Sequence, residues 1–414
     1  MTCSHRVLVT YSLLGILCVP GAWGQIAATV PAGGGAIPAA VKSASVMDAG
    51  GETQIKAFIG EQVGKFRELN TEGIPKSREV LVAEAKGGSP AYLAKYAEVL
   101  NGEILNVLKD VKDMRGRLNA AIVVARVAEI ANNTKLEKSV LALLDKGQPE
   151  ALKLWGMRAA RSVLPELVKV NGEKPLIEAV IATAKQFPTN GPLAQDAYDA
   201  LNPRNVPAKS VPAIVDPLLD LLVWRLEIYK NGVPGSKTLV PDDPLADATP
   251  IANVLHPDAW KNLDRTKKQD VRVMQLACEM FVLSATRGDD GAYQKYREQL
   301  KDSIVKMSAS LYVTASVMNE EKLKDAAGVV NKGASGQAVN LVSLVMPLCE
   351  QISHVKGFEE VKPPQIAPQQ VAPQGQGTPA AADQGAGGGG TGTAGGGEKA
   401  TGGNIPGAVV VPAK

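Results

Sequence analysis

The sequence predicts an all-α protein, built either as stacked helical hairpins of the α-solenoid kind or as an irregular multi-helix domain, and flanked by disordered tails. Apolar residues recur at steps of three and four through much of residues 51–356, the spacing that gathers them on one face of a helix. Aromatic residues form only 4% of the chain, while Ala, Leu, Val and Lys are abundant, a bias that favours helices over sheets. No alternating strand pattern of useful length is present in the sequence.

Residue types that start helices support this pattern. Ser89 and Pro90 predict the N-cap and the first turn of a helix over 89–111. Thr134 and Glu137 have the spacing of a capping box, in which each side chain bonds the other residue's backbone amide. We therefore expect a new helix to begin at that point.

Residues 89–201 fall into helix pairs joined by short turns, at a spacing of about 40 residues. Within them, Glu150–Ala160 and Leu193–Leu201 resemble the second helices of HEAT-type repeats in the spacing of their small and apolar residues. The resemblance to HEAT and armadillo proteins covers about a quarter of the chain and implies a binding surface rather than an active site. The predicted pairs are 89–111 with 117–131, 134–144 with 149–163, and 174–187 with 192–201.

The second half of the core is less repetitive. A Pro-, Gly- and Asp-rich loop is expected from Asn231 to about Pro250. An apolar helix over about 264–286 and a long helix over about 289–318 follow it. The long helix has nearly heptad apolar spacing, so it is either a coiled-coil segment or, as we prefer, one long helix packed inside the domain.

The first 24 residues predict a secretory signal peptide. The apolar run Val7–Val19 has the length of a signal sequence and falls short of the ~20 residues that a spanning helix needs. Ala22 and Gly24 are small residues at the two cleavage-pocket positions, so we expect cleavage after Gly24. The later apolar stretch Val211–Tyr229 carries four charges, which are too costly in lipid. The mature protein is thus expected to be exported, periplasmic or extracellular, in a bacterium, with no stable membrane span.

Two segments are predicted to be disordered around the helical core of 51–356. Residues 25–50 form an Ala-, Gly- and Pro-rich leader. Residues 357–414 are rich in Pro and Gln and then in Gly, and they contain too few apolar groups to offset their ordering entropy.

The composition excludes several classes of function. The formal net charge is +3, from 45 basic and 42 acidic residues, so no strong field for nucleic acid is expected. The sequence contains no nucleophile elbow, no zinc-protease motif and no dinucleotide fingerprint. We therefore predict no cofactor, no metal and no recognisable catalytic residue.

One loop carries candidate functional residues. His256 and Asp258 lie near the acidic residues Asp242, Asp243 and Asp247, where a carboxylate–imidazole pair or an oxygen-lined calcium site is conceivable. The alternative is that these residues only form turns and helix caps.

The cysteines are a second candidate. Signal cleavage leaves Cys278 and Cys349, each on the apolar side of its predicted helix, so both thiols are expected to point inward. They form either two inert buried thiols or a disulfide, which needs Cα atoms within about 7 Å. A zinc site shared with His354 is disfavoured, because residues five apart lie about 140° apart around a helix.

The function expected from these observations is that of an exported, non-enzymatic helical binding or scaffold protein, whose partner is an unidentified protein or envelope component. Two alternatives remain open. One is a structural protein of a bacterial envelope or compartment shell, and the other is an enzyme whose carboxylate site is assembled without a local motif.

Overall fold

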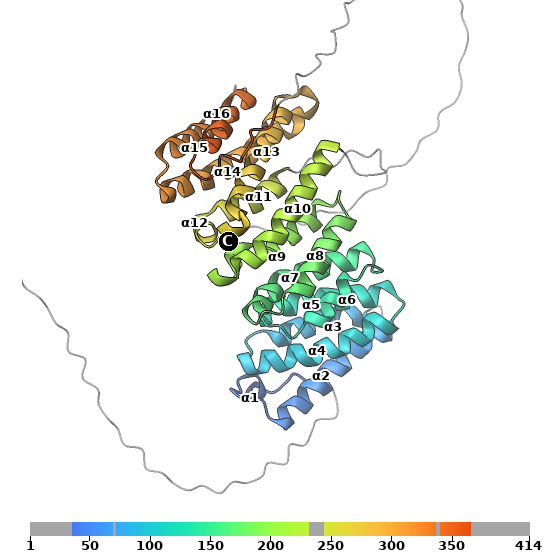
Figure 1. The fold of residues 1–414 in the computed structure, drawn as a ribbon. Helices are drawn as coiled ribbons and strands as arrows, with labels where there is room; N and C mark the ends of the chain where they lie inside the picture. Colours follow the sequence, from blue (N-terminus) through green and yellow to red (C-terminus); the bar gives the residue numbers. More distant parts are fainter. Residues whose placement is uncertain (1–34, 69–71, 232–243, 337–339, 366–414) are drawn as a thin grey trace, which may run out of the picture. The chain divides into compact units, whose positions relative to one another are not determined.

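The computed structural model describes residues 35–68, 72–231, 244–336 and 340–365 (Figure 1). These residues contain sixteen α-helices and four short 3₁₀ helices and no strand, which confirms the all-α prediction. The predicted signal peptide, the first part of the leader and the chain beyond 365 lie outside the described residues, as do Asp242 and Asp243.

The longer helices pack in two layers. In what we call the first layer, each helix packs against the next one of the same layer. Its members are α2 (Ala49–Arg67), α4 (Pro90–Asp110), α6 (Glu137–Leu144), α8 (Lys174–Gln186), α10 (Val211–Asn231), α13 (Gln269–Asp289) and α16 (Leu341–Ser353).

The second layer repeats this arrangement, and each of its helices also packs against a sequence neighbour in the first layer. Its members are α3 (Gly73–Ala85), α5 (Met114–Ala131), α7 (Glu150–Lys169), α9 (Gly191–Ala200), α11 (Pro244–Leu255), α14 (Arg297–Met318) and α15 (Glu321–Ala334). The predicted pairs correspond to α4 with α5, α6 with α7, and α8 with α9, and the two helices of each pair are in contact.

The short elements connect these layers. They are α1 (Ala39–Lys42), α12 (Pro257–Trp260), η1 (Pro203–Asn205), η2 (Ala208–Ser210), η3 (Arg265–Lys267) and η4 (Gly291–Tyr296).

Local chemistry explains several helix starts. The Ser89 hydroxyl accepts a hydrogen bond from the Tyr92 amide at 3.2 Å, so the predicted cap of α4 is confirmed. The predicted capping box is wrong: Leu136 stands at the N-cap of α6, and the Glu137 amide donates to the Thr134 carbonyl at 3.1 Å. The physical reason is a preceding turn, in which the Asn133 side chain accepts from the Lys135 amide at 3.0 Å.

Close packing fixes how the paired helices approach each other. A Cβ atom on Gly156 of α7 would lie 2.9 Å from the Cβ of Leu143 on α6, so a larger residue at this position would push the two helices apart. Helix α5 packs against helices of both layers, including α3, α4 and α7.

Two predictions for the second half are wrong. Part of the expected loop is α11, because its apolar residues Ile251 and Leu255 are buried at helical spacing. The expected long helix is divided into η4 and α14, because the Asp290 side chain caps η4 through the Ala292 amide and Arg297 donates to the Gly288 carbonyl at the junction. Tyr293 and Tyr296 consequently lie in η4, outside the proposed heptad.

The core also extends past both predicted boundaries. Within the leader, Ile37 is buried and the carbonyl of Lys42 accepts the amide of Ser89 at 2.8 Å. Within the predicted tail, Phe358 is buried against Trp260, with ring centroids 6.0 Å apart. The sequence boundary at 356 missed this contact because it is made by a single aromatic residue outside any periodic pattern.

Candidate functional site

The aspartate proposed for the acidic loop belongs to a buried ion pair. Asp247 on α11 is fully buried and accepts Arg225 Nε from α10 at 3.2 Å and Arg225 Nη2 at 3.3 Å. The Tyr198 hydroxyl donates to the same carboxylate, and Arg225 Nη2 also donates to the Tyr229 hydroxyl at 2.9 Å. Burial raises the pKa of Tyr198 well above its usual range, which keeps it a donor. This cluster joins α9, α10 and α11 and uses both carboxylate oxygens of Asp247.

The histidine of the same loop is a helix cap. His256 precedes α12, and its Nδ1 accepts the Asp258 amide at 3.4 Å and lies 3.4 Å from the Asp258 carboxylate. This geometry matches the turn-and-cap alternative. Among the residues that the structure describes, no group of three or more His, Cys, Asp or Glu side chains has the arrangement of a metal site.

Cys278 on α13 and Cys349 on α16 are both fully buried and in contact. The Cys349 thiol donates to the Cys278 carbonyl at 3.8 Å. The Cys349 thiol and burial together raise the pKa of Cys278 well above its usual range. Both residues are free thiols in the structure, and a disulfide between them stays a prediction. His354 is exposed at the C-cap of α16.

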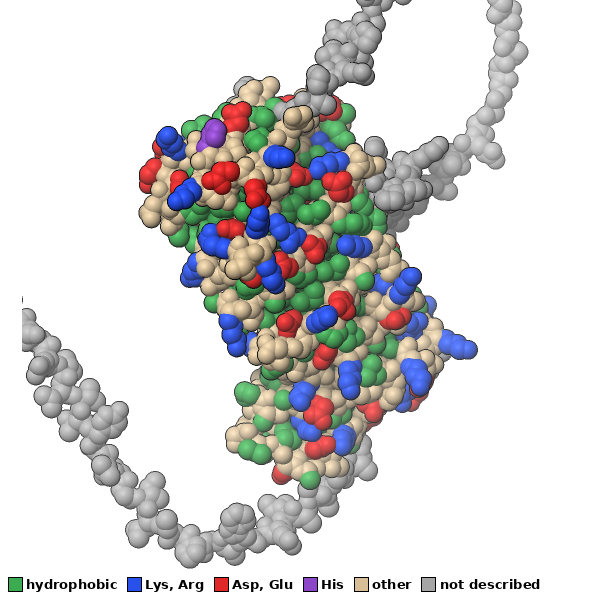
Figure 2. All heavy atoms as spheres, viewed as in Figure 1, with side chains coloured by type: hydrophobic (Ala, Val, Ile, Leu, Met, Phe, Trp, Pro, Cys, Tyr) green, Lys and Arg blue, Asp and Glu red, His purple; other side chains and the backbone are tan. Residues whose placement is uncertain are grey.

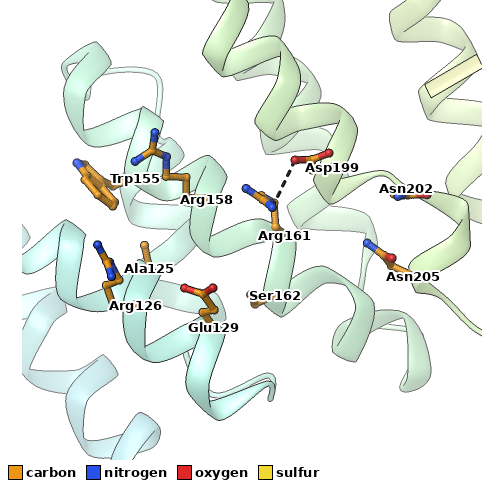
Figure 3. Close-up of a pocket in the computed structure, with 10 residues that line it drawn as sticks. All are labelled: Ala125, Arg126, Glu129, Trp155, Arg158, Arg161, Ser162, Asp199, Asn202 and Asn205. Carbon is orange, nitrogen blue, oxygen red and sulfur yellow. Dashed lines mark ion pairs between the residues drawn. The ribbon is translucent and has the colours of Figure 1, made fainter. Parts of the chain in front are cut away.

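A polar cavity of about 560 Å³ opens along the second layer, and we call it the arginine pocket (Figure 3). Helices α5, α7 and α9 and the 3₁₀ helix η1 supply its lining, so the stacking of successive second-layer helices creates it. The lining residues are Ala125, Arg126, Glu129, Trp155, Arg158, Arg161, Ser162, Asp199, Asn202 and Asn205.

Two of the three arginines in the pocket are held by carboxylates. Asp196 on α9 accepts Arg158 Nε at 3.4 Å and Arg161 Nη1 at 3.3 Å, and Arg161 Nη2 lies 3.4 Å from Asp199. Arg158 also stacks on the ring of Trp155, with 4.6 Å from the guanidinium carbon to the ring centroid. These contacts fix the orientation of the two guanidinium groups.

Three further polar side chains of the pocket are exposed to solvent. Arg126, Glu129 and Asn205 are exposed, and they form no ion pair or side-chain hydrogen bond with other residues in the described part of the chain. Figure 3 shows Arg126 and Glu129 projecting from α5 toward the side of the pocket lined by α7. The pocket therefore offers unused donors and acceptors of both charges beside a half-buried indole.

A smaller cavity of about 220 Å³ continues the pocket toward α3. Arg126 and Trp155 line both cavities, and the smaller one adds Arg78 and Glu79. Arg78 donates to Asn119 on α5 at 3.1 Å, which ties α3 to the same surface. The two cavities together expose polar side chains from four second-layer helices.

The sequence reasoning placed its candidates in the second half of the chain and missed this pocket. A signal was present, because Asn119, Arg126 and Glu129 form a narrow polar line on the mostly apolar helix 117–131. A charged line on a nearly buried helix indicates a surface that the fold keeps accessible.

On the face shown in Figure 2, the Lys and Arg side chains are interspersed with Asp and Glu, so this face has no large area of a single sign. In the described ranges, no helix is both long and apolar enough to cross a membrane. Comparison with family models, with curated proteins and with solved structures finds no match for this chain.

Proposed function

We propose that the protein is an exported, non-enzymatic binding or scaffold protein that contacts a partner protein through the arginine pocket. The supporting observation is the set of exposed polar groups on Arg126, Glu129 and Asn205, which the packing of α5, α7, α9 and η1 brings into one cavity. The volume of about 560 Å³ falls in the usual range of ligand sites and has room for a few side chains of a partner.

The two-layer packing supports the further proposal that the helix pairs form an array of the HEAT or armadillo type. Each helix packs against its sequence neighbour and against the next helix of its own layer, as expected for repeats that bury a continuous core by stacking. Such arrays present extended surfaces to other proteins.

The chemistry of the pocket favours a peptide segment as the bound group. Arg126 offers up to five N–H donors in a planar fork that matches a carboxylate. Glu129 and Asn205 match backbone amides or basic side chains, and Trp155 offers an apolar ring face. A peptide with both acidic and amide groups satisfies all of these positions.

Affinity capture from envelope extract, quantified by mass spectrometry, tests the proposal. The full-length mature chain is compared with Arg126→Glu, Trp155→Ala and a matched control, Lys138→Glu, on the exposed side of α6. We expect a protein that the wild type and Lys138→Glu enrich equally, and that Arg126→Glu recovers at least about tenfold less, because tenfold corresponds to about 1.4 kcal/mol.

Equal recovery by all four chains would show that the arginine pocket is not the binding surface. Export is tested separately: the chain purified from the producing cell should begin at Gln25, whereas an intact N-terminus in the cytoplasm would contradict it.

A further inference from the structure

A second cavity, of about 610 Å³, lies between α14 and α15, and we call it the apolar groove. Tyr312 and Val313 of α14 line it together with Gly328 and Val329 of α15. The side chains of Tyr312, Val313 and Val329 are 41%, 46% and 61% exposed. Adjoining apolar side chains that stay exposed beside polar residues are typical of a surface that binds another protein.

Contacts within the chain hold the two walls of the groove together. A Cβ atom on Gly328 would lie 3.4 Å from the Tyr312 ring, so the two helices approach closely at this point. The Asn331 side chain of α15 donates to the Val305 carbonyl at 3.0 Å and to the Ser308 hydroxyl at 3.4 Å, both on α14. The groove is therefore formed without a partner, and Asn331 uses its amide donors inside the chain.

Two opposite charges lie on the α15 side of the groove. Asp325 and Lys332 both line it and are exposed, and in the described part of the chain neither forms an ion pair or a side-chain hydrogen bond. They are seven residues apart, which is about two helical turns, so they lie about 10 Å from each other on the same face. Gly328 and Val329 are midway between them. The face thus carries one negative and one positive group at equal distances from an apolar centre.

The position of α15 in the fold leaves this face uncovered. Each second-layer helix from α5 to α14 packs against second-layer neighbours on two sides. Within the described residues, α15 packs in that layer against α14 alone, and it packs against α16 in the first layer (Figure 1). The side of α15 that carries Leu323 and Val330 is buried, whereas Val329 is exposed. A further helix placed on this exposed side would continue the second layer.

We propose that a second copy of this chain covers the apolar groove, with α15 of one copy antiparallel to α15 of the other. The two-fold axis passes between Gly328 and Val329. Asp325 of each copy then meets Lys332 of the other, so the contact contains two ion pairs. A two-fold interface uses the same patch on both copies, so the patch must complement itself, and the charges of α15 do so in this orientation.

The parallel arrangement of the two helices fails on the same charges. It would place Asp325 against Asp325 and Lys332 against Lys332, and like charges that face each other across an interface are unfavourable. In the antiparallel arrangement, Val329 of each copy lies against the apolar groove of the other, where Gly328 leaves room for it. The arginine pocket is on other helices, so this inference does not rest on the proposed function.

Sedimentation equilibrium of the purified full-length protein tests the proposal. We expect a concentration-dependent equilibrium between monomer and dimer. Val329→Asp places a charge at the centre of the contact and should raise the dimer dissociation constant at least about tenfold. Val170→Asp is the matched control, because Val170 has a similar exposed fraction of 65% and lies at the end of α7, and it should leave the dissociation constant unchanged.

Reversing the charges of α15 tests the orientation. Asp325→Lys gives each copy two positive groups on this face, and Lys332→Asp gives each copy two negative groups. Either substitution alone should weaken the dimer at least about tenfold, and the double variant, which exchanges the two charges, should restore it. A mixture of the two single variants should form heterodimers in preference to homodimers, because only the mixed pair has opposite charges at both contacts.

Three results would overturn the proposal. A wild-type protein that is monomeric at about 100 μM shows that no stable second copy covers the groove. A dimer that Val329→Asp leaves intact uses a different surface. A double charge reversal that is as weak as the single variants excludes the antiparallel contact, since a mere loss of folding would also weaken the double variant. Circular dichroism of every variant checks that its helices are retained.

Discussion

Two arginine–aspartate clusters between neighbouring helices, one at α10 and α11 and the other at α7 and α9, differ in burial. Between α10 and α11, the side chains of Arg225 and Asp247 are 5% and 0% exposed. Between α7 and α9, Arg158 and Arg161 reach Asp196 with side chains that are 41% and 47% exposed. The same residue types thus form a buried ion pair that links two helices in one region, and part of a solvent-exposed surface in the other.

The two clusters also differ in how many of their arginine N–H donors have a hydrogen-bond acceptor. Around Arg225, the donors are used by Asp247, by the Tyr229 hydroxyl and by the carbonyl of Pro188. Beside Arg158 and Arg161, the exposed side chain of Arg126 has no partner in the described residues. Open polar groups, rather than the presence of charged residues, therefore mark the candidate site.

The largest expected effect tests the buried pair. Asp247→Ala leaves the Arg225 charge buried without its carboxylate partner and should lower the free energy of unfolding by about 3–5 kcal/mol, measured by urea denaturation of the purified protein. As a control, Asp220→Ala removes one of the two carboxylate partners of Arg272, at an Asp side chain that is 65% exposed, and should cost less than about 1 kcal/mol. If Asp247→Ala lowered the free energy of unfolding as little as the control does, the buried ion pair would not be a structural contact of this importance.

The second prediction concerns the open cluster. Arg158→Ala should change the free energy of unfolding by less than about 1 kcal/mol, because the Arg158 side chain is 41% exposed and Asp196 keeps Arg161 as a partner. The same substitution should weaken capture of the partner about tenfold, since it removes a guanidinium and its stacking on Trp155. Unchanged capture together with a large loss of stability would reverse the roles assigned to the two clusters.

Sequence reasoning could predict the fold from apolar spacing because each helix must bury one face. The Ser89 cap and the pairs from α4 to α9 follow from local patterns. The start of α6 could not be predicted, because an Asx turn at Asn133 competes with the capping box. Residues spaced like a capping box do not show which hydrogen bond prevails.

The candidate site was harder to predict because its parts are far apart in the chain. Arg126, Arg158 and Asn205 lie on different elements, and only the packing of α5, α7 and η1 brings them to one cavity. By contrast, His256 and Asp258 are close in sequence and attracted a functional interpretation, but they form a helix cap. Local clustering of titratable residues therefore directed attention to a helix cap and away from the arginine pocket.

The buried Lys153 extends the comparison of charged groups, because no carboxylate of the described residues lies within ion-pair distance of it. Lys153 of α7 is 1% exposed and donates to the Gln186 side chain at 2.6 Å and to the Leu144 carbonyl at 3.4 Å. Burial lowers the pKa of Lys153 from its ordinary value.

Because the folded pKa of Lys153 is lowered, the unfolded chain binds more protons between the folded pKa and the ordinary Lys value of about 10.4, and stability rises with pH across that window. Lys153→Met should remove this rise and change the unfolding free energy at neutral pH by no more than about 1 kcal/mol. Urea denaturation of both proteins at neutral and alkaline pH measures the difference, and parallel pH profiles would refute the assignment.

The smallest expected effect comes from Asp196, the carboxylate shared by Arg158 and Arg161. Burial raises its pKa above the ordinary Asp value, and this outweighs the two guanidinium groups, which lower it. The folded chain therefore binds more protons than the unfolded chain between the ordinary Asp pKa and the raised one. Stability contributed by this group is fully present below the ordinary Asp pKa and is lost as pH rises through the raised pKa.

Asp196→Asn should abolish this dependence and should cost less than about 1 kcal/mol near neutral pH, because the amide keeps one acceptor for the arginines. Thermal or urea unfolding of wild type and variant over the mildly acidic range measures the difference between their pH profiles. If the wild type instead gains stability relative to the variant as pH rises, the two arginines lower the pKa of Asp196 more than burial raises it. The cluster around Asp196 would then resemble the buried Arg225–Asp247 pair more closely than the exposure of its arginines indicates.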